Sequence, residues 1–158
     1  MTDFERLFNE NREIVFRYLM KMTRDISLSE ELTQETFFRA YMNYSSLRNK
    51  KRASVWLCQI AKNTYFAWYN EQKKKDSFDD IDIASNEVGV EDAFVQKELS
   101  HEAMLCLHEL EEPYKEVFML SVFGGFSLKD ISLMFGKSES WARGTFYRAK
   151  QKILEKLR

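Results

Sequence analysis

Apolar residues along the chain recur at intervals of three, four and seven, which is the spacing of one face of an α-helix. In the first half of the chain this period predicts long helices at about 3–22, 27–44 and 54–74. In the second half it predicts shorter helices at about 94–109, 113–123, 127–135 and 138–156. The alternation typical of strands is found nowhere, so the pattern predicts an all-α fold.

Two stretches interrupt the helical period. Residues 45–52 are polar and basic and are expected to form a loop. Residues 76–92 carry seven acidic and no basic residues, and they bury too little apolar surface to offset the entropy of ordering. We therefore expect two small helical domains, 1–75 and 94–158, joined by a flexible acidic linker at 76–93.

A cap is also predicted for the second helix. Ser27 or Ser29 is expected to cap the second helix, which would place Glu30 and Glu31 in its first turn. Serine is a favourable cap, and carboxylates in a first turn complement the helix dipole.

Charge is segregated along the chain although the total is balanced. The 158 residues include 24 Lys/Arg and 25 Asp/Glu, for a net charge of −1. Residues 1–75 carry +5, residues 76–92 carry −7, and residues 127–158 carry +5. Basic surfaces on either side of an acidic connector favour a nucleic-acid partner. The same arrangement predicts that the connector partly masks those surfaces in the free protein.

Other classes of function are disfavoured. No apolar run reaches the ~18–20 residues that span a bilayer, and the N-terminus does not resemble a signal peptide. Cys58 and Cys106 lie in apolar surroundings, as expected of buried thiols in a cytoplasmic protein. His101 and His108 match no common zinc spacing. With no phosphate loop or nucleophile motif either, we expect no metal, no cofactor and no enzymatic activity.

The sharpest local pattern lies at residues 127–143. Ser127 and Ser138 can cap two consecutive helices, and Gly136 lies where the first of them would end in a left-handed residue. Two short helices joined by a three- or four-residue turn containing glycine are typical of the DNA-binding helix-turn-helix.

The second helix of this motif has an apolar and a polar face. The apolar face comprises Ala142, Phe146, Ala149, Ile153 and Leu157. Arginine and glutamine can read base edges in a major groove, while lysine and serine suit phosphates. The residues expected to face duplex DNA are Ser138, Ser140, Arg143, Gly144, Tyr147, Arg148, Lys150 and Gln151.

Two further groups of residues lie in the first half. Glu31, Gln34, Glu35 and Phe38 share one side of the second helix and could dock a basic helix of a partner. The third helix is expected to bury Trp56, Leu57, Ile60, Ala61, Thr64 and Trp68. Its other face and the preceding loop interleave aromatics with cations and amides, a combination suited to single-stranded nucleic acid. These residues are Arg48, Asn49, Lys50, Lys51, Arg52, Lys62, Asn63, Phe66, Tyr69, Asn70 and Lys73.

In this order the parts resemble the sigma-70 family of bacterial RNA polymerase initiation factors, in its small extracytoplasmic-function (ECF) group. The resemblance covers nearly the whole chain. Leu32-x-Gln34-Glu35-x-Phe37 is similar to the core-binding helix of region 2.2. Trp56-Leu57-x-x-Ile60-Ala61-x-Asn63 is similar to the −10 helix, and 110–118 with the helix-turn-helix is similar to region 4.

The resemblance implies a monomer that binds core polymerase through the β′ clamp and β flap. It implies that the acidic face of the second helix meets the clamp, that loop 47–52 and Asn63 read the single-stranded −10 element, and that Arg143 and Arg148 read the duplex −35 element. A cognate anti-sigma factor, often membrane-anchored in this family, is a further implied partner. Ala67, Asn70, Trp141 and Thr145 depart from residues common in the family.

Two alternatives remain open from the residues alone. A helix-turn-helix repressor or activator, with a first half that serves as a dimerisation or ligand module, would bind a palindromic operator. A helical adaptor that binds only proteins would carry its basic helix incidentally.

Overall fold

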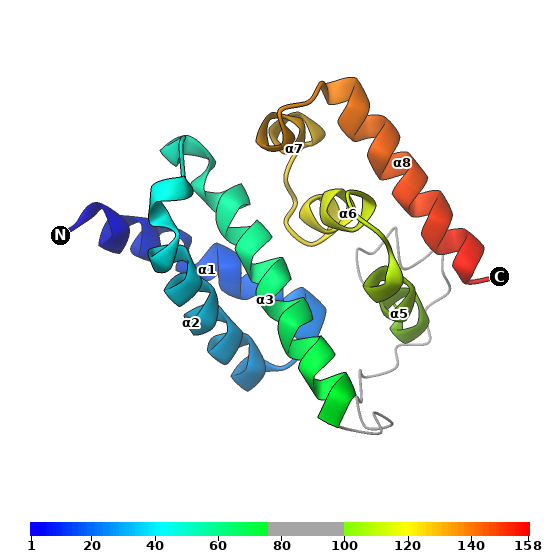
Figure 1. Cartoon of the computed structure of the whole chain (residues 1–158), viewed down its shortest axis with the longest axis horizontal. Helices are drawn as coiled ribbons and strands as arrows, with labels where there is room; N and C mark the ends of the chain where they lie inside the picture. The colour runs from blue at the N-terminus through cyan, green and yellow to red at the C-terminus, as the bar shows by residue number, and fades with distance from the viewer. Residues whose placement is uncertain (76–99) are drawn as a thin grey trace. The chain divides into compact units, whose positions relative to one another are not determined.

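The computed structural model describes residues 1–75 and 100–158. The predicted linker at 76–93, and the beginning of the helix predicted at 94, lie outside the described residues. The chain divides into two compact units, Met1–Asp80 and Ile81–Arg158. The described residues of both units form helices and no strand, which confirms the all-α prediction (Figure 1).

The first unit is a three-helix bundle. Helices α1 (Asp3–Thr23), α2 (Ile26–Met42) and α3 (Ala53–Lys75) each pack on the other two. Its core contains Leu7, Val15, Leu19, Met22, Leu32, Phe37, Leu57 and Ala61. The predicted loop between α2 and α3 contains two short 3-10 turns, η1 (Tyr44–Ser46) and η2 (Lys50–Arg52).

The predicted cap of the second helix was wrong. Asp25 caps α2, because its side chain accepts a hydrogen bond from the Leu28 amide at 3.0 Å. Ser29 is instead buried within the first turns of the helix, where its hydroxyl lies 2.6 Å from that of Thr23. Because the helix begins earlier than predicted, Glu30 and Glu31 lie beyond its first turn.

Helix α3 buries a different set of side chains from the one predicted. Lys62, Phe66 and Tyr69 were expected on its open face, yet their exposed fractions are only 3%, 9% and 3%. Ile60 and Trp68, expected inside, are half-buried. The physical reason is that aromatic and apolar residues surround most of this helix, and a helix that is apolar on nearly all sides is buried on nearly all sides.

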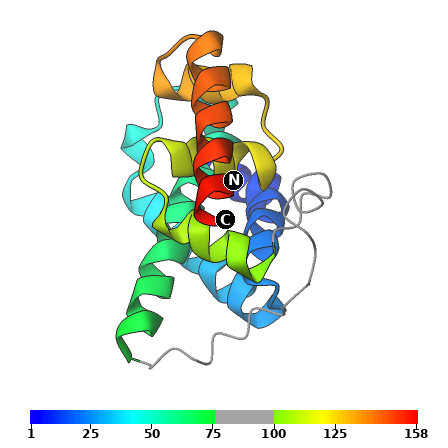
Figure 2. The same ribbon diagram turned by 90° about the vertical axis from the view of Figure 1, so that its right-hand side faces the viewer.

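The second unit consists of α5 (His101–Glu109), α6 (Tyr114–Val122), α7 (Leu128–Phe135) and α8 (Glu139–Lys156). Helix α8 packs against α5, α6 and α7, and α7 lies at its N-terminal end (Figure 2). The core includes Leu107, Phe118, Leu120, Ile131, Ala142 and Ile153. The ring of Phe118 also stacks on that of Phe146 at 5.7 Å.

Candidate functional site

The predicted stripe on α2 is a continuous exposed face. Glu31, Gln34, Glu35 and Phe38 are all exposed. The Glu35 carboxylate accepts a hydrogen bond from the Arg39 guanidinium at 2.9 Å, an ion pair within the helix that leaves both side chains about half exposed. The structure therefore presents carboxylates, an amide and an aromatic ring together on one side of the bundle.

Sequence reasoning missed the end of this face. Tyr41 and Met42 are 62% and 66% exposed, and they follow Phe38 at three and four residues on the same side of α2. The spacing alone could have found them. The face is thus acidic near the start of α2 and apolar near its end, a combination suited to an amphipathic basic partner.

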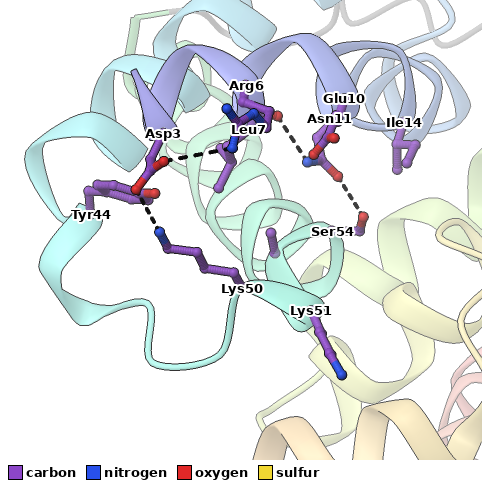
Figure 3. Close-up of a pocket in the computed structure, with 11 residues that line it drawn as sticks. Asp3, Arg6, Leu7, Glu10, Asn11, Ile14, Tyr44, Lys50, Lys51 and Ser54 are labelled. Carbon is purple, nitrogen blue, oxygen red and sulfur yellow. Dashed lines mark hydrogen bonds and ion pairs between the residues drawn. The ribbon is translucent and has the colours of Figure 1, made fainter. Parts of the chain in front are cut away.

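The loop before α3 is organised by its own side chains. The Asn49 side chain accepts a hydrogen bond from the Lys51 amide at 3.0 Å, and this contact begins turn η2. Lys50 donates to the Asp3 carboxylate of α1 at 2.9 Å (Figure 3). Arg48 and Lys51 are exposed, and Arg52 is half-buried. The loop thus offers exposed cations on a folded backbone.

Helix α3 has a narrower open face than predicted. Asn63, Asn70 and Lys73 are exposed, as the sequence suggested, and Ala67 joins the two asparagines in one stripe along the helix. The Lys73 ammonium lies 5.7 Å from the centre of the Tyr69 ring. Two amides and a cation are therefore available on this helix for contact with nucleic acid.

The helix-turn-helix has the predicted caps. The Ser127 hydroxyl accepts a hydrogen bond from the Asp130 amide, and that of Ser138 accepts one from the Trp141 amide, both at 3.1 Å. Gly136 ends α7 with a φ of 66°, a left-handed conformation in which a side chain would be strained. These local contacts set the start of α8.

The polar face of α8 is mostly open. Ser138, Ser140, Arg143, Tyr147 and Arg148 are exposed, whereas Gly144, Lys150 and Gln151 are half-buried. Arg143 donates to Glu139 at 2.8 Å within the helix. The Arg148 guanidinium lies 3.2 Å from the position that a Gly144 Cβ would occupy, so the glycine leaves room for that arginine along the helix.

Two unusual residues of α8 are explained by packing. Trp141 is half-buried, with its ring 5.3 Å from that of Phe135 at the end of α7. Thr145 is buried and therefore does not lie on the open face of α8. The Trp141 ring thus joins the two helices of the motif, and the buried Thr145 adds nothing to its polar surface.

Comparison with known proteins identifies the family to which this chain belongs. Residues 7–75 match the family Sigma-70 region 2, and residues 100–153 match the family Sigma-70, region 4. The ECF RNA polymerase sigma factor SigM of Bacillus subtilis is 31% identical over 140 residues, which cover 88% of this chain and 85% of that protein. The chain belongs to the ECF group of the sigma-70 family.

Other similarities agree with this assignment. The sigma factor SigZ of Bacillus subtilis is 24% identical over 98% of this chain and 87% of its own. The crystal structure of the sigma factor RpoE with the anti-sigma factor NepR from Bartonella quintana matches with a TM-score of 0.57 and 18% identity, over 99% of this chain and 98% of that one, a likeness that shows the fold.

As an ECF sigma factor, the chain directs promoter-specific initiation by binding core RNA polymerase and reading −10 and −35 elements. Region 2 corresponds to α1–α3 and region 4 to α5–α8. No finding supports the alternative of a dimeric repressor or activator.

The described residues of this sigma factor were also searched for a reactive thiol, a metal site and a membrane-spanning helix. Burial raises the pKa of the Cys58 thiol to about 12, so this cysteine stays protonated near neutral pH. Within residues 1–75 and 100–158, no group of three His, Cys, Asp or Glu side chains is placed to hold a metal ion. Over the same residues, no helix has the length and hydropathy needed to cross a membrane.

Proposed function

We propose that this sigma factor docks on core polymerase through the exposed face of α2. Glu31, Gln34 and Glu35 would meet basic residues of the β′ clamp, and Phe38 would fill an apolar site beside them. The support for this is that the face is continuous and exposes an aromatic ring beside charged side chains. An aromatic side chain that becomes buried on binding, next to charged pairs, is typical of the residues that dominate binding energy. Region 4 would contact the β flap.

The −10 element would be held by the loop and the open stripe of α3. Arg48 and Lys51 are placed to follow phosphates, and Asn63 and Asn70 can hydrogen-bond to unpaired bases. Bases are accessible in this way only after they leave the duplex, so binding them favours the open complex. Lys62, Phe66 and Tyr69 are buried, so the proposed DNA-binding surface includes only the exposed residues of the loop and of α3.

The −35 element would be read by α8 in the major groove. Arg143, Tyr147 and Arg148 are exposed on the polar face and follow the N-terminal turn that a helix-turn-helix presents to DNA.

The functional domains would span 1–75 and 94–158. Catalysis would belong to the polymerase, and the sigma factor would act beside it in the cytoplasm under the control of a cognate anti-sigma factor.

The test of this proposal is co-elution of the full chain with purified core polymerase. We expect a stoichiometric complex from a monomeric protein that binds duplex DNA weakly on its own. Tight binding of the isolated protein to a palindrome as a dimer, with no complex on core polymerase, would contradict the proposal.

A further inference from the structure

An ion pair joins the first turn of α1 to the loop before α3. The Lys50 ammonium lies 2.9 Å from the Asp3 carboxylate, although 47 residues separate them in sequence (Figure 3). The hydrogen bond and charge of Lys50 lower the pKa of Asp3. Those of Asp3 raise the pKa of Lys50, so both groups are charged at neutral pH.

Aromatic rings reinforce the same junction. The Phe4 ring makes edge-to-face contacts with Tyr41 at 5.2 Å and with Tyr44 at 5.4 Å. The Lys50 ammonium also lies 6.0 Å from the centre of the Tyr44 ring, within the range of a cation–π interaction. Lys50 is therefore held between the Asp3 carboxylate of α1 and the ring of Tyr44 in η1, which packs on Phe4 of α1.

The neighbouring lysine is oriented differently. The Lys51 side chain is directed away from Asp3 and Tyr44 (Figure 3). Its amide donates to the Asn49 side chain, and the Arg52 amide donates to the Asn49 carbonyl at 2.9 Å, so turn η2 is well formed. Lys50 and Lys51 are neighbours in the same turn, so restraining Lys50 also restrains the backbone from which the Lys51 side chain projects.

We propose that Asp3 is a positioning residue for recognition of the −10 element. It holds Lys50 so that loop 47–52 presents Lys51 and Arg48 to the melted strand, and Lys50 holds the loop instead of binding a phosphate. This inference rests on the proposed contact between the loop and single-stranded DNA. It gives the N-terminal turn of α1 a part in promoter opening.

The direction in which Asp3→Asn changes DNA binding distinguishes a positioning role of Asp3 from a direct contact between Lys50 and DNA. If Lys50 bound a DNA phosphate, Asp3 would compete with that phosphate, and Asp3→Asn would strengthen binding. If Asp3 positions the loop, Asp3→Asn loosens the loop and weakens binding.

The experiment measures open-complex formation by the holoenzyme on a promoter selected from a random library with the wild-type protein. Because exposed ion pairs contribute little each, we expect Asp3→Asn and Lys50→Gln each to lower open-complex formation about two- to fivefold. The double variant should be no worse than either single one, and the exchange Asp3→Lys with Lys50→Asp should recover most of the loss.

Glu13→Gln is the matched control, because it removes a carboxylate of α1 whose ion pair, to Arg17 at 2.6 Å, lies within the helix. It should leave open-complex formation unchanged. A gain with Asp3→Asn, a loss confined to Lys50→Gln, or an equal loss with Glu13→Gln would each overturn the proposal.

Hydrogen exchange of the free protein provides an independent readout. Asp3→Asn should accelerate exchange of the Lys51 and Arg52 amides while leaving α2 unchanged, and unchanged exchange in the loop would overturn the positioning role. Lys51→Gln and Arg48→Gln together separate the two proposals. If Lys51→Gln and Arg48→Gln both leave open-complex formation intact, the loop does not contact the strand and the proposed function fails there, while hydrogen exchange still decides whether Asp3 holds the loop.

Discussion

Replacing Gln34 and Glu35 together by alanine is expected to weaken binding to core polymerase about 30-fold. The two side chains lie at the centre of the exposed α2 face. Loss of one hot spot at the centre of an interface costs about 2 kcal/mol, which corresponds to about 30-fold, and we expect the two neighbouring side chains together to supply one such hot spot. The substitution removes no buried contact, so the fold should be retained. Titration of labelled core polymerase with each protein measures the change.

The control for this prediction is Arg39→Gln. It breaks the ion pair with Glu35 but leaves the carboxylate on the surface, so binding should be retained or slightly strengthened. Attraction between charges also weakens with salt, and the difference between wild type and double variant should shrink as ionic strength rises. Equal binding by wild type and double variant at low salt would remove α2 from the interface.

Replacing Arg148 by alanine is expected to relax sequence preference at one position of the −35 element. A bidentate contact between arginine and guanine discriminates by about 1–3 kcal/mol, which corresponds to roughly 5- to 150-fold in relative affinity. The measurement compares holoenzyme binding to promoters that carry each of the four base pairs at every −35 position.

Lys152→Gln is the matched control for loss of a positive charge. Lys152 is on the same helix, but its ammonium lies 3.3 Å from Glu111 and 4.9 Å from the centre of the Tyr114 ring. Base preference should therefore be unaffected by this change. If Arg148→Ala weakens all sequences equally, Arg148 contacts the backbone and does not read a base.

The sequence predicted the helix-turn-helix well because its signals are local. Ser127, Gly136 and Ser138 act through contacts within three or four residues, so residue type alone identifies both ends of α7 and the start of α8. The charged part of the exposed α2 face was also predictable, because Glu31, Gln34 and Glu35 recur at helical spacing on one side of the helix.

Helix α3 was harder because periodicity there does not define a single buried face. Trp56, Tyr65 and Phe66 point in different directions around the helix, and all three are buried. Lys62 lies among them and is buried too, although its residue type suggested an open surface. Only packing in three dimensions decides which sides of such a helix are covered.

Contacts between distant segments could not be predicted at all. The pairing of Asp3 with Lys50 depends on how α1 lies beside the loop, and neither residue has a local signal that points to the other. The contact of Trp141 with Phe135 spans only six residues, but it depends on the angle at which α7 and α8 meet, and residue type alone did not indicate it.

The most direct test of this account is reconstituted transcription with purified core polymerase on a library of random upstream sequences. With this protein present, we predict specific transcripts whose start sites share two upstream sequence blocks, separated by about one and a half turns of duplex. Core polymerase alone should give none of them. Absence of protein-dependent start sites, or start sites that share only one palindromic block, would contradict the account.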